Sequence, residues 1–179
     1  MEPAIAIRAE RPDDGPVIAG VVRRAYADVP YSDHREHRMV DRLRRTDAYL
    51  PALSLLAEVA GEAVGHVLLT RAHVRGARSA AETLALAPLS VVPEFQGRGV
   101  GRRLVEAAHA QAVALGFRTV VLVGPPGYYA RFGYEPLRRY PVTLPFDAPD
   151  ENCMIAALVP HAADGLAGRV EYAPGWLDH

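Results

Sequence analysis

The sequence predicts one mixed α/β domain in which helices flank a central sheet. Three observations support this expectation: a length of 179 residues with no linker that would separate two domains, a hairpin-like pattern over residues 53–74, and a strand, glycine loop, helix, strand unit over residues 84–123. Hydrophobic residues make up 50% of the chain and charged residues 23%, as is ordinary for a domain that folds alone.

The chain begins with the pattern of one strand followed by two helices. Residues 4–9 alternate between apolar and polar side chains, which is typical of a half-buried strand. Pro12-Asp13-Asp14 is a favourable helix start, and apolar residues then recur at helical spacing over residues 17–25. A second and more polar helix is expected over residues 34–45.

Three strands are expected next. Residues 53–59 and 63–74 flank the short turn Ala60-Gly61-Glu62, which predicts a hairpin. Residues 82–92 form a third strand-like run, and Pro88 inside it predicts a bulge or an edge strand.

A glycine loop and a helix follow this third strand. The helix has an apolar face made of Leu104, Val105, Ala108, Ala112 and Leu115. Its end is predicted at Leu115-Gly116-Phe117, because glycine commonly terminates helices. Residues 119–123 are apolar on both faces, as buried parallel strands tend to be, and residues 152–159 form a last strand-like run in which Cys153 is a small buried residue.

The composition excludes several function classes. The net charge of −1 provides no global field that attracts nucleic acid or an anionic membrane. All 20 cationic residues are arginine, so a phosphate loop ending in lysine, a Schiff-base lysine and a lysine base are excluded. The single cysteine excludes internal disulfides and a four-cysteine zinc site. With no secretory pattern at the N-terminus and no apolar run of membrane length, we expect a soluble cytoplasmic protein.

The loop containing Gly97, Gly99 and Gly101 is suited to binding an anion, because a glycine turn that enters a helix exposes backbone amides at the positive end of the helix dipole. Arg102 stands where a dinucleotide fingerprint needs its third glycine, which argues against a nucleotide-binding oxidoreductase. A pyrophosphate, as in coenzyme A, is the remaining candidate ligand. For the loop alone, a tight turn without a ligand is the alternative.

Two motifs in order resemble the GNAT superfamily of acyl-CoA N-acyltransferases. Leu89-Ser-Val-Val-Pro-Glu-Phe-Gln-Gly-Arg-Gly-Val-Gly101 is similar to strand 4 and the Gln/Arg-x-x-Gly-x-Gly/Ala loop of that family, and Tyr129-Ala-Arg-Phe-Gly-Tyr-Glu135 is similar to its Tyr-x-x-x-Gly-Phe signature. The resemblance implies a single GNAT domain over residues 1–179, with a core over about residues 4–158 and a C-terminal extension over residues 160–179. It also implies a mixed, mostly antiparallel sheet in which parallel strands 4 and 5 splay apart.

The resemblance further implies the donor site and the reaction. The pantetheine arm would pair with the backbone of strand 4 and the pyrophosphate would lie on the glycine loop. The implied cofactor-binding residues are Leu89, Ser90, Val91, Gln96, Gly97, Arg98, Gly99, Val100, Gly101 and Arg102. The implied activity is the transfer of an acetyl group from acetyl-CoA to the primary amine of a small molecule or peptide, with no metal involved. A homodimer is compatible with the resemblance. The alternative is a catalytically weak acyl-CoA-binding module that senses the cofactor or serves a partner.

The implied general acid is Tyr129, which matches the tyrosine that protonates the departing sulfur in many relatives; Tyr128 is the better candidate for core packing. The residue that would act as general base is less clear, because Val123 stands where many relatives carry a carboxylate on strand 5. Glu82, with Glu58 and His66 as further candidates, lies on a nearby strand, although charged strand residues are more often solvated surface groups. A water chain is the alternative.

Three other features of the sequence bear on the site. Gly124-Pro125-Pro126-Gly127 replaces a longer polar segment of many relatives, which puts in doubt an asparagine contact to the pantetheine. His34 and His37 have a spacing that can bind metal, but no third ligand is evident and a polar helix face is expected. Residues 160–179, rich in Gly, Ala and Pro, are expected to cover the acceptor site or a partner surface.

Overall fold

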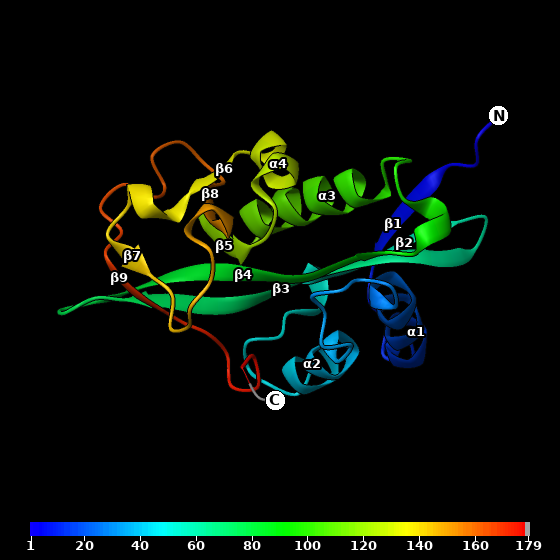
Figure 1. The fold of residues 1–179 in the computed structure, drawn as a ribbon, viewed down its shortest axis with the longest axis horizontal. Helices are drawn as coiled ribbons and strands as arrows, with labels where there is room; N and C mark the ends of the chain where they lie inside the picture. The colour runs from blue at the N-terminus through cyan, green and yellow to red at the C-terminus, as the bar shows by residue number, and fades with distance from the viewer. Residues whose placement is uncertain (178–179) are drawn as a thin grey trace.

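The computed structural model describes residues 1–177, which form one mixed sheet between two layers of helices (Figure 1). The strands are β1 (Ile5–Ala9), β2 (Ser54–Val59), β3 (Glu62–Arg75), β4 (Ala80–Val91), β5 (Thr119–Val123), β6 (Tyr134–Pro136), β7 (Val142–Thr143), β8 (Cys153–Ala157) and β9 (Gly168–Glu171). The helices are α1 (Gly15–Tyr26), α2 (Glu36–Leu43), α3 (Val100–Ala114) and α4 (Pro126–Tyr129). The sheet order is β1-β2-β3-β4-β5-β8-β6, and β9 joins β3 to β7.

Most of the strand pairs are antiparallel, and the pair β4–β5 is parallel, as expected. The β4–β5 pairing is short: Leu84 lies opposite Val120 and Ala85 lies opposite Val121. Beyond these positions the two strands diverge while β4 continues to Val91. Along the last residues of β4, the backbone groups on the side of β5 therefore have no strand partner within residues 1–177.

The predicted hairpin is confirmed, with a two-residue turn between β2 and β3. Ala60 and Gly61 have φ of 51° and 80°, so both lie in the left-handed region. A turn with two such residues matches the right-handed twist of the strands that it joins.

The bulge predicted from Pro88 is also confirmed. Val67 lies opposite Leu89, whereas Leu69 lies opposite Leu86, so β4 contains one residue more than β3 between these pairs. An extra residue bends a strand and re-aims the side chains that follow it. As a result Leu86 and Leu89, three positions apart, pack on the same apolar cluster.

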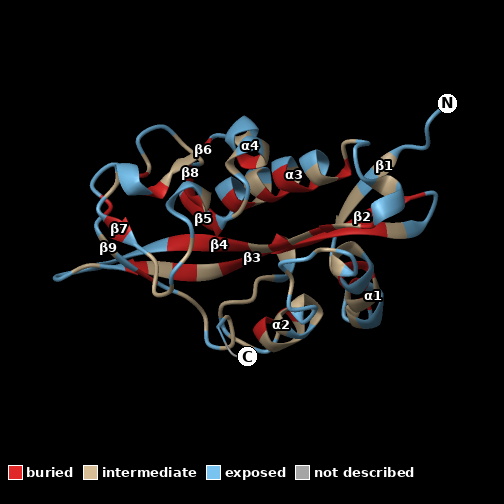
Figure 2. Ribbon diagram, viewed as in Figure 1, coloured by how far each residue is buried: buried red, intermediate tan, exposed pale blue. Residues whose placement is uncertain are grey.

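Helices cover both faces of the sheet (Figure 2). α3 buries Val100, Leu104, Val105, Ala108 and Ala112 against one face, and α1 with α2 covers the other. One predicted core residue is corrected: Leu115 is 46% exposed, because α3 ends at the preceding residue, and Phe117 is buried instead.

The C-terminal segment is part of the sheet. β9 pairs with His73, Val74 and Arg75 of β3, and Trp176 packs near α2. This end of β3 lies far from the glycine loop in Figure 1. None of residues 160–177 lines the cavity at the glycine loop, and the last two residues lie outside the described part of the chain. That residues 160–179 cover the acceptor site or a partner surface stays a prediction.

Candidate active site

A cavity of about 510 Å³ opens where β4 and β5 diverge, a size typical of ligand pockets. Four segments form its walls: the end of α1 with the residues after it, the end of β4, the glycine loop with the first turn of α3, and the segment after β5. The lining residues are Ala25, Tyr26, Val29, Tyr31, Leu89, Val91, Phe95, Gln96, Gly97, Gly99, Val100, Gly101, Arg102, Pro125, Tyr128, Tyr129 and Arg131.

The glycine loop presents free backbone amides to this cavity. Gly97 and Gly99 have φ of 73° and 83°, a conformation that glycine adopts without steric cost. Gly99 is the N-cap of α3, and no side chain of residues 1–177 caps this helix end. The first-turn N–H groups, which lack partners inside the helix, are thus available to an anion and lie at the positive end of the helix dipole.

Gly101 allows α4 to approach the first turn of α3. A Cβ at Gly101 would collide with the hydroxyl of Tyr128. The guanidinium of Arg131 lies 4.8 Å from the centre of the Tyr128 ring, and Arg102 lines the same wall. Two cations therefore lie near the helix end where a pyrophosphate would bind.

The end of β4 presents alternate residues to the cavity. Val92 donates its backbone N–H to Val64 of β3 (2.9 Å), and because the direction of backbone groups alternates along a strand, Ser90 also faces β3. Leu89 and Val91 face the gap, where Tyr26 donates to the Leu89 carbonyl and the Gln96 side chain donates to the Val91 carbonyl, both at 3.0 Å. The backbone groups of Leu89 and Val91 thus face the gap, whereas those of Ser90 face β3, and the role of Ser90 in cofactor binding stays a prediction.

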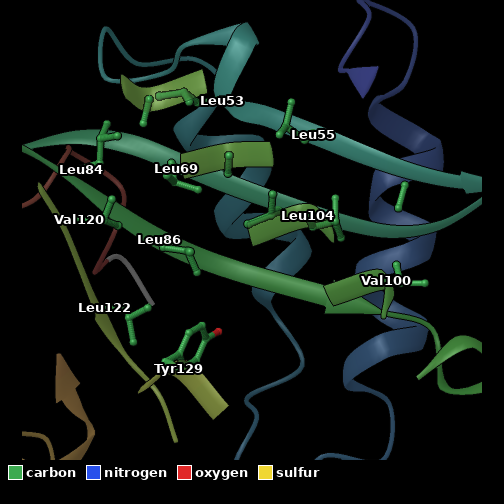
Figure 3. Close-up of a cluster of buried hydrophobic side chains, with 14 of the residues drawn as sticks. Leu53, Leu55, Leu69, Leu84, Leu86, Val100, Leu104, Val120, Leu122 and Tyr129 are labelled. Carbon is green, nitrogen blue, oxygen red and sulfur yellow. The ribbon is translucent and has the colours of Figure 1, made fainter. Parts of the chain in front are cut away.

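Tyr129 lies between the diverging strands (Figure 3) and is 8% exposed. Its ring makes edge contacts with Tyr128 and Tyr134 at centroid distances of 5.0 and 5.6 Å. A Cβ at Gly124 would lie 2.5 Å from this ring, so glycine at that position provides the space. Burial raises the pKa of Tyr129 well above its usual value, which keeps the phenol protonated and able to donate.

Two further side chains near the loop were expected at the site. The guanidinium of Arg98 lies 5.2 Å from the centre of the Phe95 ring and is not part of the cavity lining, so its role in cofactor binding stays a prediction. Tyr128 is half-buried and lines the cavity, so it is a wall residue as well as a packing residue.

The structure does not bring the candidate carboxylate bases to the cavity. Glu82 is exposed at the opposite end of β4, with an oxygen 3.1 Å from the Arg71 side chain. Glu58 on β2 accepts a hydrogen bond from Arg8 at 2.9 Å. Because a base must lie within hydrogen-bond reach of its proton or one water away, these positions exclude direct roles for both residues.

His66 is fully buried on β3, outside the cavity wall, and its Nε2 lies 2.9 Å from the Ser54 hydroxyl. Burial, with a smaller contribution from the charge of Arg44, lowers the pKa of His66 to about 3, so the ring is neutral at physiological pH. Val123 is 42% exposed and carries no acid–base group. The cavity lining given by the described residues contains neither a carboxylate nor a histidine.

No motif in the sequence indicates the wall formed by Tyr26, Val29 and Tyr31. Tyr26 follows the apolar stripe of α1 and resembles a core residue, and Tyr31 is 86% exposed in a connecting segment. Only the tertiary placement of α1 against β4 brings these residues to the site.

Within residues 1–177 there is no group of three side chains arranged to hold a metal ion. None of the helices in the described part of the chain combines the length and apolar character needed to cross a membrane.

Comparison with known proteins identifies relatives of this fold and site. The acetyltransferase (GNAT) family model matches residues 21–134. The chain is 36% identical over 142 residues to the uncharacterized N-acetyltransferase YjhQ of Escherichia coli (strain K12), covering 78% of each protein. It is 28% identical to the uncharacterized N-acetyltransferase YhbS of that strain, over 93% of this chain and 95% of the relative.

Two solved structures contain the coenzyme. A GNAT family acetyltransferase from Brucella melitensis in complex with acetyl-CoA has a TM-score of 0.79 at 32% identity, with 97% of this chain and 98% of that chain covered. YhbS from Escherichia coli in complex with CoA has a TM-score of 0.86 at 27% identity, with 98% and 94% covered. The fold, the glycine loop and these relatives lead to one conclusion: the chain belongs to the GNAT family of acetyltransferases and is a GNAT-type acyltransferase.

Proposed function

We propose that the protein transfers an acetyl group from acetyl-CoA to the primary amine of a small molecule or a peptide. The observation that carries the proposal is one cavity in which an uncapped, glycine-rich helix end, an unpaired strand edge and a buried protonated tyrosine meet. The acetyl-CoA and CoA complexes of the Brucella melitensis and Escherichia coli relatives support this choice of donor.

The residues present fit the donor. The amides of residues 97–102 would hold the pyrophosphate, with Arg102 and Arg131 balancing its charge. The backbone groups of Leu89 and Val91 would bind the amide-bearing arm as an added strand. Acetyl-CoA supplies the acetyl group as a thioester.

The chemistry of the cavity is suited to acyl transfer. Tyr129 donates its proton to the departing sulfur, and its raised pKa keeps that proton available at neutral pH. The backbone N–H groups at the end of β4 face the gap and stabilise the negative charge that develops on the carbonyl oxygen.

The amine must also lose protons. An alkyl amine has a reference pKa of about 10.4, so it arrives largely as an ammonium ion and cannot attack until it is deprotonated. Because the lining of the described chain has no carboxylate or histidine, the proton leaves by a less direct route. This feature also favours the second candidate, an acyl-CoA-binding module with little turnover.

Donor binding is tested by thermal unfolding with and without acetyl-CoA. Wild type should be stabilised by the ligand, and Gly99→Val should lose that stabilisation because its side chain obstructs the anion site. The matched control is Gly116→Val: Gly116 has a similar φ of 90° with open space around it, so this variant carries the same backbone strain away from the cavity and should still respond to acetyl-CoA.

A screen of small amines and peptides, read out by release of free coenzyme A, separates the two candidate functions. Turnover above the rate of acetyl-CoA hydrolysis supports the acetyltransferase. Donor binding without turnover across the panel favours the binding module, and no stabilisation of wild type at millimolar acetyl-CoA contradicts both.

A further inference from the structure

A series of buried polar side chains crosses the sheet beneath α1 and α2. Ser90 on β4, His66 on β3 and Ser54 on β2 are 1%, 0% and 0% exposed. They lie on a face that also carries buried apolar residues such as Leu56 and Leu68. Polar groups at such positions are destabilising unless they are hydrogen-bonded, so their partners indicate what the series can do.

The hydrogen bonds define the tautomer of His66. The Ser54 hydroxyl donates its one proton to the Glu10 carboxylate. At the contact with His66 Nε2 (2.9 Å), Ser54 Oγ must therefore accept, and Nε2 carries the ring proton. Since burial keeps the ring neutral, Nδ1 is left as a bare acceptor.

His66 Nδ1 lies on the strand next to a hydroxyl donor, Ser90 Oγ, that also lacks a partner among residues 1–177. Neither His66 Nδ1 nor Ser90 Oγ has a hydrogen-bond partner among residues 1–177, and both atoms are buried. His66 and Ser90 are direct cross-strand partners on the same face, where Cβ atoms lie about 4.5–5.5 Å apart. A rotation of the Ser90 side chain or one bridging water pairs the two atoms.

The series begins at the cavity and ends at a carboxylate. Tyr26 lines the cavity, and its hydroxyl donates to the carbonyl of Leu89, the residue before Ser90 on β4, at 3.0 Å. A contact with Ser90 lowers the pKa of Tyr26, against the larger opposing effect of burial. At the other end, Glu10 has a side chain only 4% exposed and accepts a hydrogen bond from Arg44 Nε at 2.5 Å. Arg44 also pairs with Asp41, which is half-exposed.

We propose that Tyr26, Ser90, His66, Ser54 and Glu10 form a proton relay that removes the proton from the attacking amine. The relay rests on the proposed acetyl transfer, and it supplies the acceptor that neither β5 nor the cavity lining provides.

Each transfer in the relay conserves protons. As the nitrogen–carbon bond forms, the nitrogen becomes strongly acidic and gives one proton to the Tyr26 oxygen, while the Tyr26 hydroxyl turns from the Leu89 carbonyl and passes its own proton to Ser90. The Ser90 proton moves to His66 Nδ1, the Nε2 proton moves to Ser54, and the Ser54 proton moves to the Glu10 carboxylate. One N–H bond has broken, one O–H bond has formed on Glu10, and His66 has stayed neutral.

The return step restores every group. Once Tyr129 has given its proton to the sulfur, the relay runs in the opposite direction and Tyr26 passes a proton to the Tyr129 phenolate. The two tyrosines line the same cavity and are close enough for their charges to interact. The net result is one proton lost by nitrogen and one gained by sulfur.

The kinetic test compares Ser90→Ala with Thr70→Val. Thr70 is the matched control, because its hydroxyl is also buried on β3 and has no hydrogen-bond partner within the described residues, but it lies opposite Ala85 and outside the relay. Ser90→Ala should lower kcat/KM about 10- to 100-fold with unchanged acetyl-CoA affinity, and Thr70→Val should stay within about twofold of wild type.

Turnover rates measured in mixtures of H₂O and D₂O provide a second readout, which would not change if Ser90 served only in packing. Several protons move together in the relay, so the rate of wild type and of Thr70→Val should depend on the deuterium fraction along a curve, and that of Ser90→Ala along a straight line. If wild type turns over an amine and the two variants behave alike, the relay is wrong although the proposed function stands.

A second measurement decides the relay without turnover. ¹⁵N NMR of the imidazole groups should show His66 as the neutral Nε2–H tautomer, with an Nδ1 signal that shifts in Ser90→Ala and stays in place in Thr70→Val. An Nδ1–H tautomer, or an Nδ1 signal unaffected by Ser90→Ala, overturns the relay whether or not an amine substrate has been found.

Discussion

At the scale of single residues, the assignment of Tyr129 depends on its environment. The ring is enclosed by Tyr128, Tyr134 and Gly124, and burial holds its pKa above the ordinary value. A phenol that stays protonated at all physiological pH values can deliver a proton to a departing thiolate, whose conjugate thiol has a reference pKa of about 8.5.

Replacing Tyr129 with phenylalanine keeps the ring and removes the donor. We expect Tyr129→Phe to bind acetyl-CoA with wild-type affinity and to lose about 10²- to 10⁴-fold in turnover, as is usual for one acid–base group. The control is Tyr134→Phe, which removes a buried hydroxyl that contacts His109 at 2.8 Å outside the cavity. Unchanged turnover in Tyr129→Phe would remove this residue from the mechanism, and a parallel loss of affinity would assign it to binding.

At the scale of elements, the contact between α3 and α4 shapes the donor site. Gly101 in the first turn of α3 leaves room for the Tyr128 hydroxyl, and Tyr128 in turn packs against Phe132 and Arg131. The position of α4, and with it that of Tyr129, therefore depends on the absence of a side chain at Gly101 of α3.

A double-mutant cycle tests this contact. Gly101→Ala should destabilise the protein by about 1–3 kcal/mol and weaken acetyl-CoA binding, because the added methyl group displaces Tyr128. In the Tyr128→Phe background the clash is absent, so the same substitution should be neutral or stabilising by up to about 1 kcal/mol, the helix preference for alanine over glycine. Gly127→Ala, which meets nothing within 4 Å, is the control. Chemical denaturation of the variants measures the coupling; equal effects of Gly101→Ala in both backgrounds would contradict the contact.

The elements were largely predictable because their signals are local. Alternation predicted β1, the turn at Ala60 and Gly61 predicted the hairpin, and Pro88 predicted the bulge. The sequence of β4 does not reveal which backbone groups face β3 and which face the gap, so it could not distinguish Ser90 from Leu89 and Val91.

The predicted and the observed site differ because the tertiary geometry decides which residues reach the cavity. Glu82 lies on the same strand as Leu89 and Val91 but at its opposite end, and a strand of 12 residues is about 40 Å long. Tyr26 and Tyr31 carry no motif, and they reach the cavity only because α1 packs across β4. Motifs located the glycine loop, whereas the opposite wall of the cavity could be identified only from the fold.

At the scale of the whole molecule, one topological feature creates the site. A sheet with continuous pairing would bury the edge of β4, but the pairing of β4 with β5 ends after Ala85 and the cavity opens beyond it. The helical layers then contribute opposite walls, α3 and α4 from one face and the end of α1 from the other. The molecule has a net charge of only −1, so recognition of an anionic donor depends on this local arrangement.

Binding of acetyl-CoA in this gap can be observed in a crystal structure of the acetyl-CoA complex. We expect pyrophosphate oxygens hydrogen-bonded to the amides of residues 97–102, the pantetheine arm along Leu89 and Val91, and the Tyr129 hydroxyl within hydrogen-bonding reach of the thioester sulfur. A coenzyme bound elsewhere on the protein, or a Tyr129 hydroxyl directed away from the sulfur, would contradict it.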